Sequence, residues 1–215
     1  MRIENSIIKD FLPQYDFSSI DNPENILFLD IETTGLSPRT SYIYMIGMAA
    51  YYNDSWHFAG LMAENPGEEQ LILTKFLSIL HEYKTIVHFN GNRFDLPFIT
   101  ERCTANGLSV NFESFTGIDI YKRINPYRHL LGIANCKQKT LEKFVGIDRE
   151  DLYSGGELIN VYKRYMETRD ESLYKLLSLH NFEDISGMLS VISVLNIPSV
   201  FEELPTVEKV SADTY

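Results

Sequence analysis

Two carboxylates stand close together near the start of the chain, at the end of an apolar run. The apolar residues 26–29 are followed by Asp30, Ile31 and Glu32, and residues 33–35 (TTG) end the run. Residues two apart share one face of a strand, so Asp30 and Glu32 are expected to project together from a buried strand. Paired acids repel each other unless a cation lies between them, and oxygen ligands suit Mg²⁺ and Mn²⁺. The alternative is a strand end that emerges into solvent, where both acids are hydrated.

A histidine and an aspartate lie on the face of a C-terminal segment that should pack inward. Residues 171–195 predict a long helix, and at about 3.6 residues per turn its apolar stripe also contains His180 and Asp184. Burying an unpaired charge is strongly unfavourable, so both side chains should have partners. The two side chains form either an internal ion pair at i, i+4 spacing or part of a catalytic site. Glu183 lies off the stripe and is expected to be solvated.

A further acid, Asp95, stands where a strand is expected to give way to a helix. Residues 85–89 predict a short strand, residues 90–92 (NGN) break it, and residues 94–106 predict a helix. Locally, Asn92 could cap this helix, with Asp95 in a role like that of a capping box. Together with the three acids above, Asp95 could instead complete one site for two metal ions about 3.5–4 Å apart.

The elements that would position these residues follow from the hydrophobic pattern. Residues 42–52 and 55–62 have strand patterns, and the two residues between them are the spacing of a β-hairpin. With the strand at 26–32 they give three consecutive antiparallel strands. We therefore predict an α/β fold with a mixed five-stranded sheet, three antiparallel strands followed by parallel additions, flanked by helices. The remaining predicted elements are a helix at 69–80, a strand or short helix within 110–121, and a helix at 156–168.

Length and composition place these elements in one domain. The 215 residues, 44% hydrophobic and 23% charged, suffice for one α/β domain, placed at residues 26–200 between a polar lead-in, 1–25, and a C-terminal tail, 201–215. No run approaches membrane-spanning length, and the N-terminus lacks the hydrophobic run of a signal peptide, so we expect a cytoplasmic protein without a membrane partner. Cys103 and Cys136 are expected to be reduced thiols rather than disulfide or zinc ligands.

The charge of the chain argues against one class of protein. A net charge of −11 and a pI near 4.9 are the opposite of the basic footprint of a strong duplex binder. A DNA-binding domain that reads sequence is therefore disfavoured. The negative charge argues less against an enzyme that binds the end of a nucleic-acid strand through metal ions, because the ions bring positive charge to the site.

Three segments resemble, in order and spacing, the motifs of the DEDD exonuclease superfamily. Residues 28–36 (FLDIETTGL) resemble the first motif, residues 88–97 (HFNGNRFDLP) the second and residues 180–184 (HNFED) the third. The resemblance spans about residues 26–195 and extends to the YprB-type group of predicted exonucleases. It implies an RNase H-like fold.

The resemblance also implies 3′-to-5′ exonuclease activity, in which nucleoside monophosphates are released from the ends of single-stranded DNA or RNA. Asp30, Glu32, Asp95 and Asp184 would bind two divalent cations, Mg²⁺ or Mn²⁺, and His180 would orient the attacking water or accept its proton. His180 precedes Asp184 by four residues, the spacing of the tyrosine branch of the superfamily, whereas the histidine branch uses five. It could therefore serve only to hold Asp184.

Two other functions stay open beside this one. A structure-selective endonuclease could use the same fold, and a nucleic-acid-binding module could have lost catalysis, although the four intact acids disfavour the second. Asp119 lies in a segment that resembles the family after the second motif, and we expect it to be structural. The lysine-rich residues 137–143 either contact phosphates or begin a solvated helix, and the sequence identifies no protein partner.

Overall fold

The computed structural model describes residues 1–9, 11 and 15–196, and within them the chain forms one mixed sheet of six strands. The strands are β1 (Arg2–Ile7), β2 (Ile26–Thr33), β3 (Ile43–Tyr52), β4 (Ser55–Met62), β5 (Thr85–His88) and β6 (Thr116–Asp119). Their order across the sheet is β1-β4-β3-β2-β5-β6. The pairs from β1 to β2 are antiparallel, and β5 and β6 are parallel additions beside β2. The predicted fold is therefore confirmed, with six strands instead of five.

The additional strand is β1, which lies in the lead-in that the hydrophobic pattern left without an element. It pairs with β4 along its whole length, from Arg2 opposite Met62 to Ile7 opposite His57. As an edge strand it alternates half-buried and exposed residues, so it carries no apolar run that would reveal it. The domain boundaries at residues 25 and 200 remain a prediction, and the predicted tail, 201–215, lies outside the described residues.

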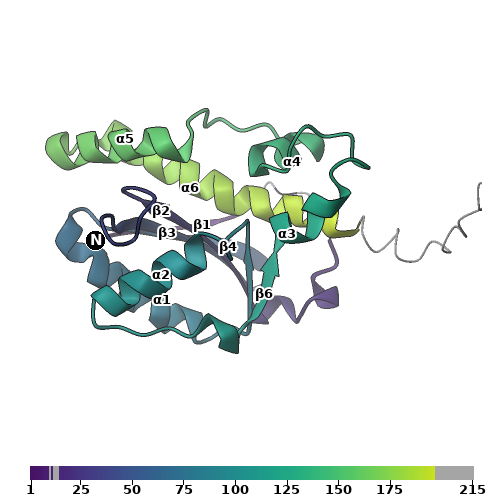
Figure 1. Cartoon of the computed structure of the whole chain (residues 1–215), viewed down its shortest axis with the longest axis horizontal. Coiled ribbons are helices and arrows are strands. Elements are labelled where there is room, and N and C mark those ends of the chain that lie inside the picture. Colours follow the sequence, from purple (N-terminus) through teal and green to yellow (C-terminus); the bar gives the residue numbers. More distant parts are fainter. Residues whose placement is uncertain (10, 12–14, 197–215) are drawn as a thin grey trace, which may run out of the picture.

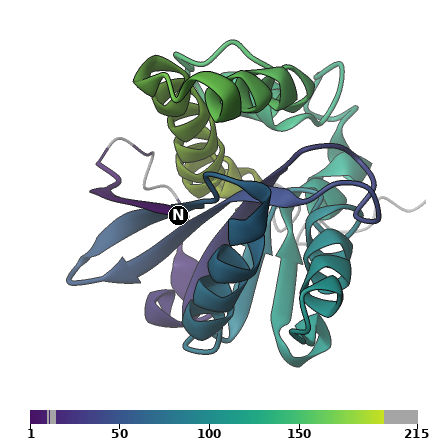
Figure 2. The same ribbon diagram turned by 90° about the vertical axis from the view of Figure 1, so that its left-hand side faces the viewer.

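Helices cover both faces of the sheet. The α-helices are α1 (Glu69–Leu80), α2 (Asp95–Ala105), α3 (Ile120–Ile124), α4 (Gln138–Phe144), α5 (Gly155–Thr168) and α6 (Glu171–Val191). Short 3-10 helices are η1 (Phe17–Ser19), η2 (Pro23–Asn25), η3 (Pro66–Glu68), η4 (Phe112–Ser114), η5 (Asn125–Tyr127) and η6 (Ile192–Leu195). α5 and α6 lie on one side of the sheet and α1 and α2 on the other (Figures 1 and 2). None of the helices within the described residues has the length and hydrophobicity needed to cross a lipid bilayer.

Two segments whose sequence pattern was ambiguous, 110–121 and 137–143, form short regular elements. Residues 110–121 contain β6 followed directly by the start of α3, where the carboxylate of Asp119 accepts the backbone N–H of Lys122 at 3.1 Å. The structural role predicted for Asp119 is thereby confirmed. Residues 138–144 form α4, with Lys137 as its N-cap, so the predicted helix is present, and whether its lysines contact phosphates stays a prediction. Cys103 and Cys136 are both buried and unbridged.

β2 divides its side chains between two cores. Phe28 belongs to the core beneath α6, whereas Leu29 belongs to the core shared with α1 and α2. Because side chains of a strand alternate, the next residues on the face of Phe28 are Asp30 and Glu32. The same alternation that packs an aromatic ring under α6 therefore directs two carboxylates toward that helix.

The turn between α5 and α6 sets the direction of the long helix. Arg169 caps the C-terminus of α5, and its φ of 57° lies in the left-handed region. The next residue, Asp170, caps the N-terminus of α6, where its carboxylate accepts the N–H of Ser172 at 2.8 Å. From this cap α6 packs against β2, β3 and β4. The helix thus crosses the centre of the sheet, where the carboxylates of β2 lie.

Candidate active site

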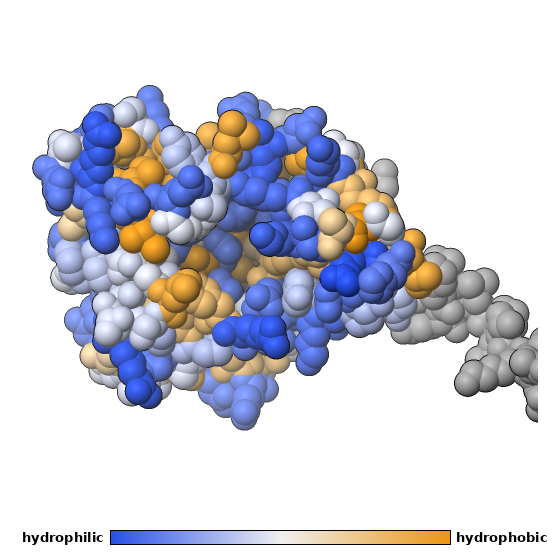
Figure 3. All heavy atoms as spheres, turned by 45° about the horizontal axis from the view of Figure 1, so that its top comes forward, coloured by the Kyte–Doolittle hydropathy of each residue, from blue (hydrophilic) through white to orange (hydrophobic). Residues whose placement is uncertain are grey.

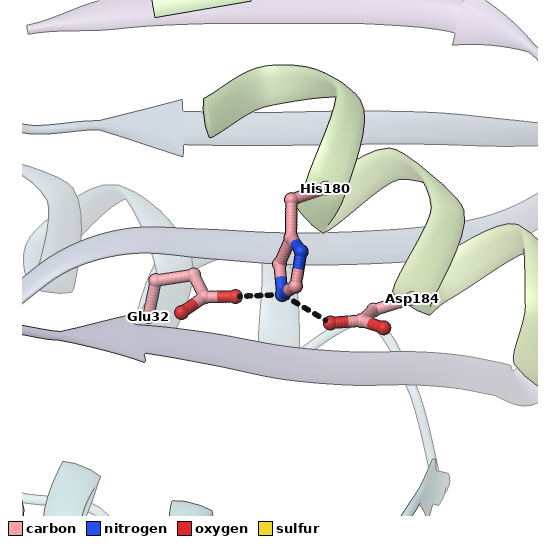
Figure 4. Close-up of side chains that lie close together, drawn as sticks. All are labelled: Glu32, His180 and Asp184. Atoms are coloured by element: carbon pink, nitrogen blue, oxygen red, sulfur yellow. Dashed lines mark ion pairs between the residues drawn. The ribbon is translucent and has the colours of Figure 1, made fainter. Parts of the chain in front are cut away.

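Three side chains meet where α6 crosses the end of β2. His180 Nε2 lies 3.1 Å from Asp184 Oδ2, one helical turn away, and 3.3 Å from Glu32 Oε1. One potential ligand atom of each residue lies within 4.8 Å of the other two. Figure 4 shows the imidazole between the two carboxylates. The ion pair expected from the i, i+4 spacing is present, and it belongs to a larger cluster.

Asp30 and Asp95 adjoin this group from two other directions. Asp30 Oδ2 accepts a hydrogen bond from Asn181 Nδ2 of α6 at 3.1 Å, and Asp95 Oδ1 accepts the backbone N–H of Ile31 at 3.3 Å. α2 begins at Asp95, its N-cap is Phe94, and no side chain caps it. The capping interpretation of Asp95 is therefore wrong, because this carboxylate turns back to β2. The structure brings all five predicted site residues together.

The pairing of β2 with β3 is irregular just beyond the acids, and the residue skipped in this pairing, Tyr44, belongs to β3. The register of β2 with β3 shifts between Glu32 and Thr33, so that Glu32 faces Met45 and Thr33 faces Ile43. Such a bulge bends a strand and redirects its side chains, and bulges are common beside active sites. In the view of Figure 3 the surface is hollowed near its centre, and both hydrophilic and hydrophobic side chains border the hollow.

Burial makes this concentration of acids costly. Burial, with the charges of Asp184 and Asp95 added to it, holds the pKa of Asp30 well above its ordinary value. Burial likewise raises the pKa of Glu32 to about 8, although the charge of His180 opposes the shift. The pKa of Asp95 rises to about 7, again chiefly because the carboxyl is buried. The cluster therefore has more carboxylates than its own positive charge can compensate.

His180 and Asp184 shift in the opposite sense to these acids. Burial lowers the pKa of His180, but the hydrogen bond and charge of Asp184, with the charges of Glu32 and Asp151, outweigh it and raise the pKa to about 9. Burial also works against ionisation of Asp184, yet His180 and Arg149 lower its pKa. Without a metal ion, the cluster therefore holds an imidazolium among its carboxylates at neutral pH.

A loop between α4 and α5 supplies two site residues that the sequence analysis missed. Asp151 is 5% exposed, and its Oδ2 lies 2.5 Å from His180 Nδ1. Arg149 Nη1 lies 2.5 Å from Asp184 Oδ1, and its Nη2 donates to the carbonyl of His180 at 3.2 Å. Both residues come from an irregular stretch without helical or strand periodicity, so only their position before a predicted helix could have drawn attention to them.

Arg149 also binds acids outside the predicted set. Its Nη1 lies 3.4 Å from Glu142 Oε2, and its Nε lies 3.3 Å from Glu183 Oε2. Glu183 also accepts the backbone N–H groups of residues 150 and 151 at 2.8 and 2.9 Å. The expectation that Glu183 is solvated is therefore wrong. It lies off the apolar stripe of α6 because it faces the loop rather than the sheet.

Asn181 is a further missed residue, and a glycine makes room for it. Asn181 is fully buried, and a Cβ placed on Gly47 of β3 would lie 2.3 Å from its Oδ1. Only a residue without a side chain allows this close approach. Asn181 lies on the inward stripe of α6 four residues after Leu177, so a buried amide next to His180 was the signal that could have identified it.

Comparisons with known proteins agree with this architecture. Residues 27–196 match the model of a family described as the RNase_H superfamily. A family B DNA polymerase from the hyperthermophilic archaeon Pyrobaculum calidifontis is similar, with 17% identity and a TM-score of 0.66, over 81% of this chain and 25% of the polymerase. No curated protein matches the chain.

Structures of exonuclease I are similar at a lower level. One, described as suggesting how processivity is achieved, has 14% identity and a TM-score of 0.49 over 72% of this chain and 43% of its own. The zinc-bound form of the E. coli exonuclease I complex with single-stranded DNA has 16% identity and a TM-score of 0.43, with 72% and 43% covered. The chain thus spans a quarter of the polymerase and less than half of these exonucleases, and at such identities the likeness concerns the fold.

Proposed function

Because the chain belongs to the RNase H superfamily, we propose that it is a metal-dependent nuclease, and specifically a 3′-to-5′ exonuclease of the DEDD type and its YprB-type group. Its substrate would be a single-stranded DNA or RNA end, and its product a nucleoside monophosphate. The observation that carries the proposal is the convergence of Asp30, Glu32, Asp95 and Asp184 from β2, α2 and α6. The direction of cleavage rests on the resemblance of the three sequence motifs.

The donor set fits divalent cations. Carboxylate oxygens are the ligands that Mg²⁺ and Mn²⁺ prefer, and the raised pKa values of Asp30, Glu32 and Asp95 mark a cluster short of positive charge. These three acids and Asp184 would hold two ions. When bound, such ions activate water and offset the charge of a phosphodiester. His180 now occupies the space between Glu32 and Asp184, so its proton and a cation compete for the same oxygens.

His180 would take up and release the proton of the reaction at Nε2. Asp151 fixes the ring through Nδ1, which leaves Nε2 facing the carboxylates of Glu32 and Asp184. A ring oriented in this way is suited to general acid-base work. The other role considered for His180 is to hold Asp184 alone, and His180→Gln separates the two. Glutamine can still hydrogen-bond to Asp184 but cannot carry the proton.

Two neighbours would keep the metal-binding acids in place. Arg149 holds Asp184 Oδ1 at 2.5 Å, and Asn181 holds Asp30 Oδ2 at 3.1 Å. Both donors are themselves fixed, Arg149 by surrounding acids and Asn181 by complete burial. Ligands held by neighbouring side chains keep the geometry that metal binding requires.

The experiment that tests the proposal is digestion of 5′-labelled single-stranded DNA and RNA oligonucleotides in Mg²⁺ or Mn²⁺, with Asp30→Ala and EDTA as controls. We expect a ladder that shortens from the 3′ end, is absent in both controls, and shows which sugar is preferred. Internal fragments without a ladder would replace the exonuclease with an endonuclease of the same fold. No cleavage despite bound metal would overturn the proposal in favour of a binding module.

For His180→Gln, the same digestion is combined with Mn²⁺ binding measured by calorimetry. Loss of cleavage with retained Mn²⁺ binding would support the proton-carrying role. Retained cleavage would assign His180 to holding Asp184.

A further inference from the structure

A recess of about 690 Å³ lies beside the acid cluster, between the loop after β5 and the residues of α3 and η5. We infer that this recess binds the phosphate backbone of a single-stranded nucleic acid, upstream of the end that is cut. The inference rests on the proposed function and adds to it the path of the strand. Its main lining residues are Asn92, Arg93, Asp119, Tyr121, Lys122 and Asn125.

The topology of the sheet places the recess next to the site. β5 is parallel to β2 and directly beside it, with Val87 opposite Phe28. The chain therefore leaves β5 at the same end of the sheet at which β2 presents its acids. Arg93 lines the recess and stands two residues before Asp95, so the loop that forms one wall leads directly into the cluster.

The recess is positively charged. Arg93 and Lys122 are exposed, and neither forms an ion pair within the part of the chain that the structure describes. Among the described residues that line the recess, Asp119 is the one acid, and it is 4% exposed. Its Oδ1 accepts the backbone N–H groups of Asn90 at 3.0 Å and Lys122 at 3.1 Å. With that carboxylate directed at the backbone, the two cations are free to bind an anion.

The segment that follows the recess in sequence is rich in basic residues, which supports the binding of a polyanion there. Residues 120–143, which follow directly from the recess, carry six of the 19 Lys and Arg residues but only one of the 30 Asp and Glu residues. That acid, Glu142, is 1% exposed and paired with Arg149. A chain with a net charge of −11 therefore keeps one segment almost free of exposed acids. Such a segment attracts a polyanion and steers it toward the adjacent site.

The shape and polarity of the recess favour a nucleotide strand over a single small anion. Its volume lies within the range of about 300–1,000 Å³ that is typical of pockets for organic ligands. Tyr121 lines it, with its ring half-buried and held edge-on to Phe89 at a centroid distance of 6.0 Å. A fixed aromatic ring in the same recess as two cations suits a nucleic-acid strand that alternates bases and phosphates, because bases stack on rings of this kind.

The test measures binding without cleavage. Fluorescence anisotropy with 5′-fluorescein (dT)12 and U12 in Ca²⁺, repeated in EDTA, compares the wild type with Arg93→Gln/Lys122→Gln at several salt concentrations. Each phosphate contact to a single strand contributes about 0.7 to the salt slope, so losing two should flatten it by about 1.4 and weaken binding about 25-fold at about 0.1 M salt. Comparison of the two probes shows whether the strand is preferred as DNA or RNA.

Two matched variants keep the result specific. Lys75→Gln/Lys84→Gln removes the same charge from exposed lysines of α1 and the opposite end of β5, and it should bind like the wild type. Arg93→Lys/Lys122→Arg keeps the charge and should also bind like the wild type. Equal weakening in both neutralised variants, or none in the recess variant, would overturn the recess while leaving the nuclease intact. Failure of the wild type to bind either probe would overturn the proposed substrate itself.

Discussion

Replacing Glu32 by glutamine should stabilise the metal-free protein and abolish its cleavage of nucleic acid. Glu32 is 7% exposed and shares its surroundings with Asp30, Asp95 and Asp184. Its burial and these charges favour the protonated carboxyl, and an amide resembles that form without carrying a titratable proton. The variant therefore removes an electrostatic cost that the wild type carries in the absence of the proposed metal ions.

The size of the effect follows from the pKa of Glu32, which rises from 4.5 to about 8 in the folded protein. The folded state then holds this proton more tightly than the unfolded chain. Glu32 consequently contributes stability that is complete below pH 4.5 and is lost as the pH rises to about 8. One pH unit corresponds to about 1.4 kcal/mol, so at pH 7 the glutamine variant should be more stable by about 3 kcal/mol.

Urea unfolding in EDTA at pH 5.5, 7 and 8 measures this difference. The advantage of Glu32→Gln should grow by about 1.4 kcal/mol per pH unit between pH 5.5 and 7 and more slowly as the pH approaches 8. Saturating Mn²⁺, at about 100 times its Kd, should add about 2.7 kcal/mol to the wild type and less to the variant, which lacks one ligand. Glu24→Gln, at an exposed position, is the control and should show no such trend. A difference that does not change with pH, or a variant less stable than the wild type at pH 8, would refute the reasoning.

Three further perturbations test the surroundings of the site. Gly47→Ala places a Cβ 2.3 Å from Asn181 Oδ1, and urea unfolding should show a loss of about 1–3 kcal/mol; an unchanged midpoint would mean that the amide moves away freely. Arg149→Leu leaves the buried Glu142 without its cation and should cost about 3–5 kcal/mol by the same assay, whereas a neutral result would remove Arg149 from the network. Asp184→Ala should keep the folded circular dichroism spectrum but lose all cleavage in the oligonucleotide assay, and residual activity would contradict its place in the site.

The sequence predicts those parts of the site that lie on regular elements. The two-residue alternation around Asp30 and the helical stripe of 171–195 are local patterns. The first correctly places Asp30 and Glu32 on one face of β2, and the second correctly indicates the inward face of α6. Asp95 could not be separated from a cap by its neighbours, because its hydrogen bond to Ile31 joins residues 64 positions apart. For the loop at Arg149 there was no periodic signal, since its contacts are made by an irregular backbone.

The same limit applies to the fold. The central strands are visible because both of their faces are buried, whereas β1 is an edge strand that needs little apolar surface. α4 is short and carries exposed lysines, so its buried side, with Leu141 and Glu142, contributes too few residues to give a clear period. An element is predictable from sequence when its buried residues are numerous enough to show a period, which holds for β4 and α1 but not for β1 or α4.

The position of α6 makes the completeness of the site depend on the docking of this one helix. The hydrogen bond from Asn181 to Asp30 spans 151 residues, and His180 and Asp184 reach the site on the same helix. Bringing residues so far apart in sequence together costs loop-closure entropy, which the packing of α6 on the sheet must offset. Without α6, β2 and α2 supply only Asp30, Glu32 and Asp95 of the proposed metal site. Because one helix carries His180, Asn181 and Asp184 together, the proposed activity requires α6 to be docked on the sheet, and a chain in which this helix is displaced should be inactive.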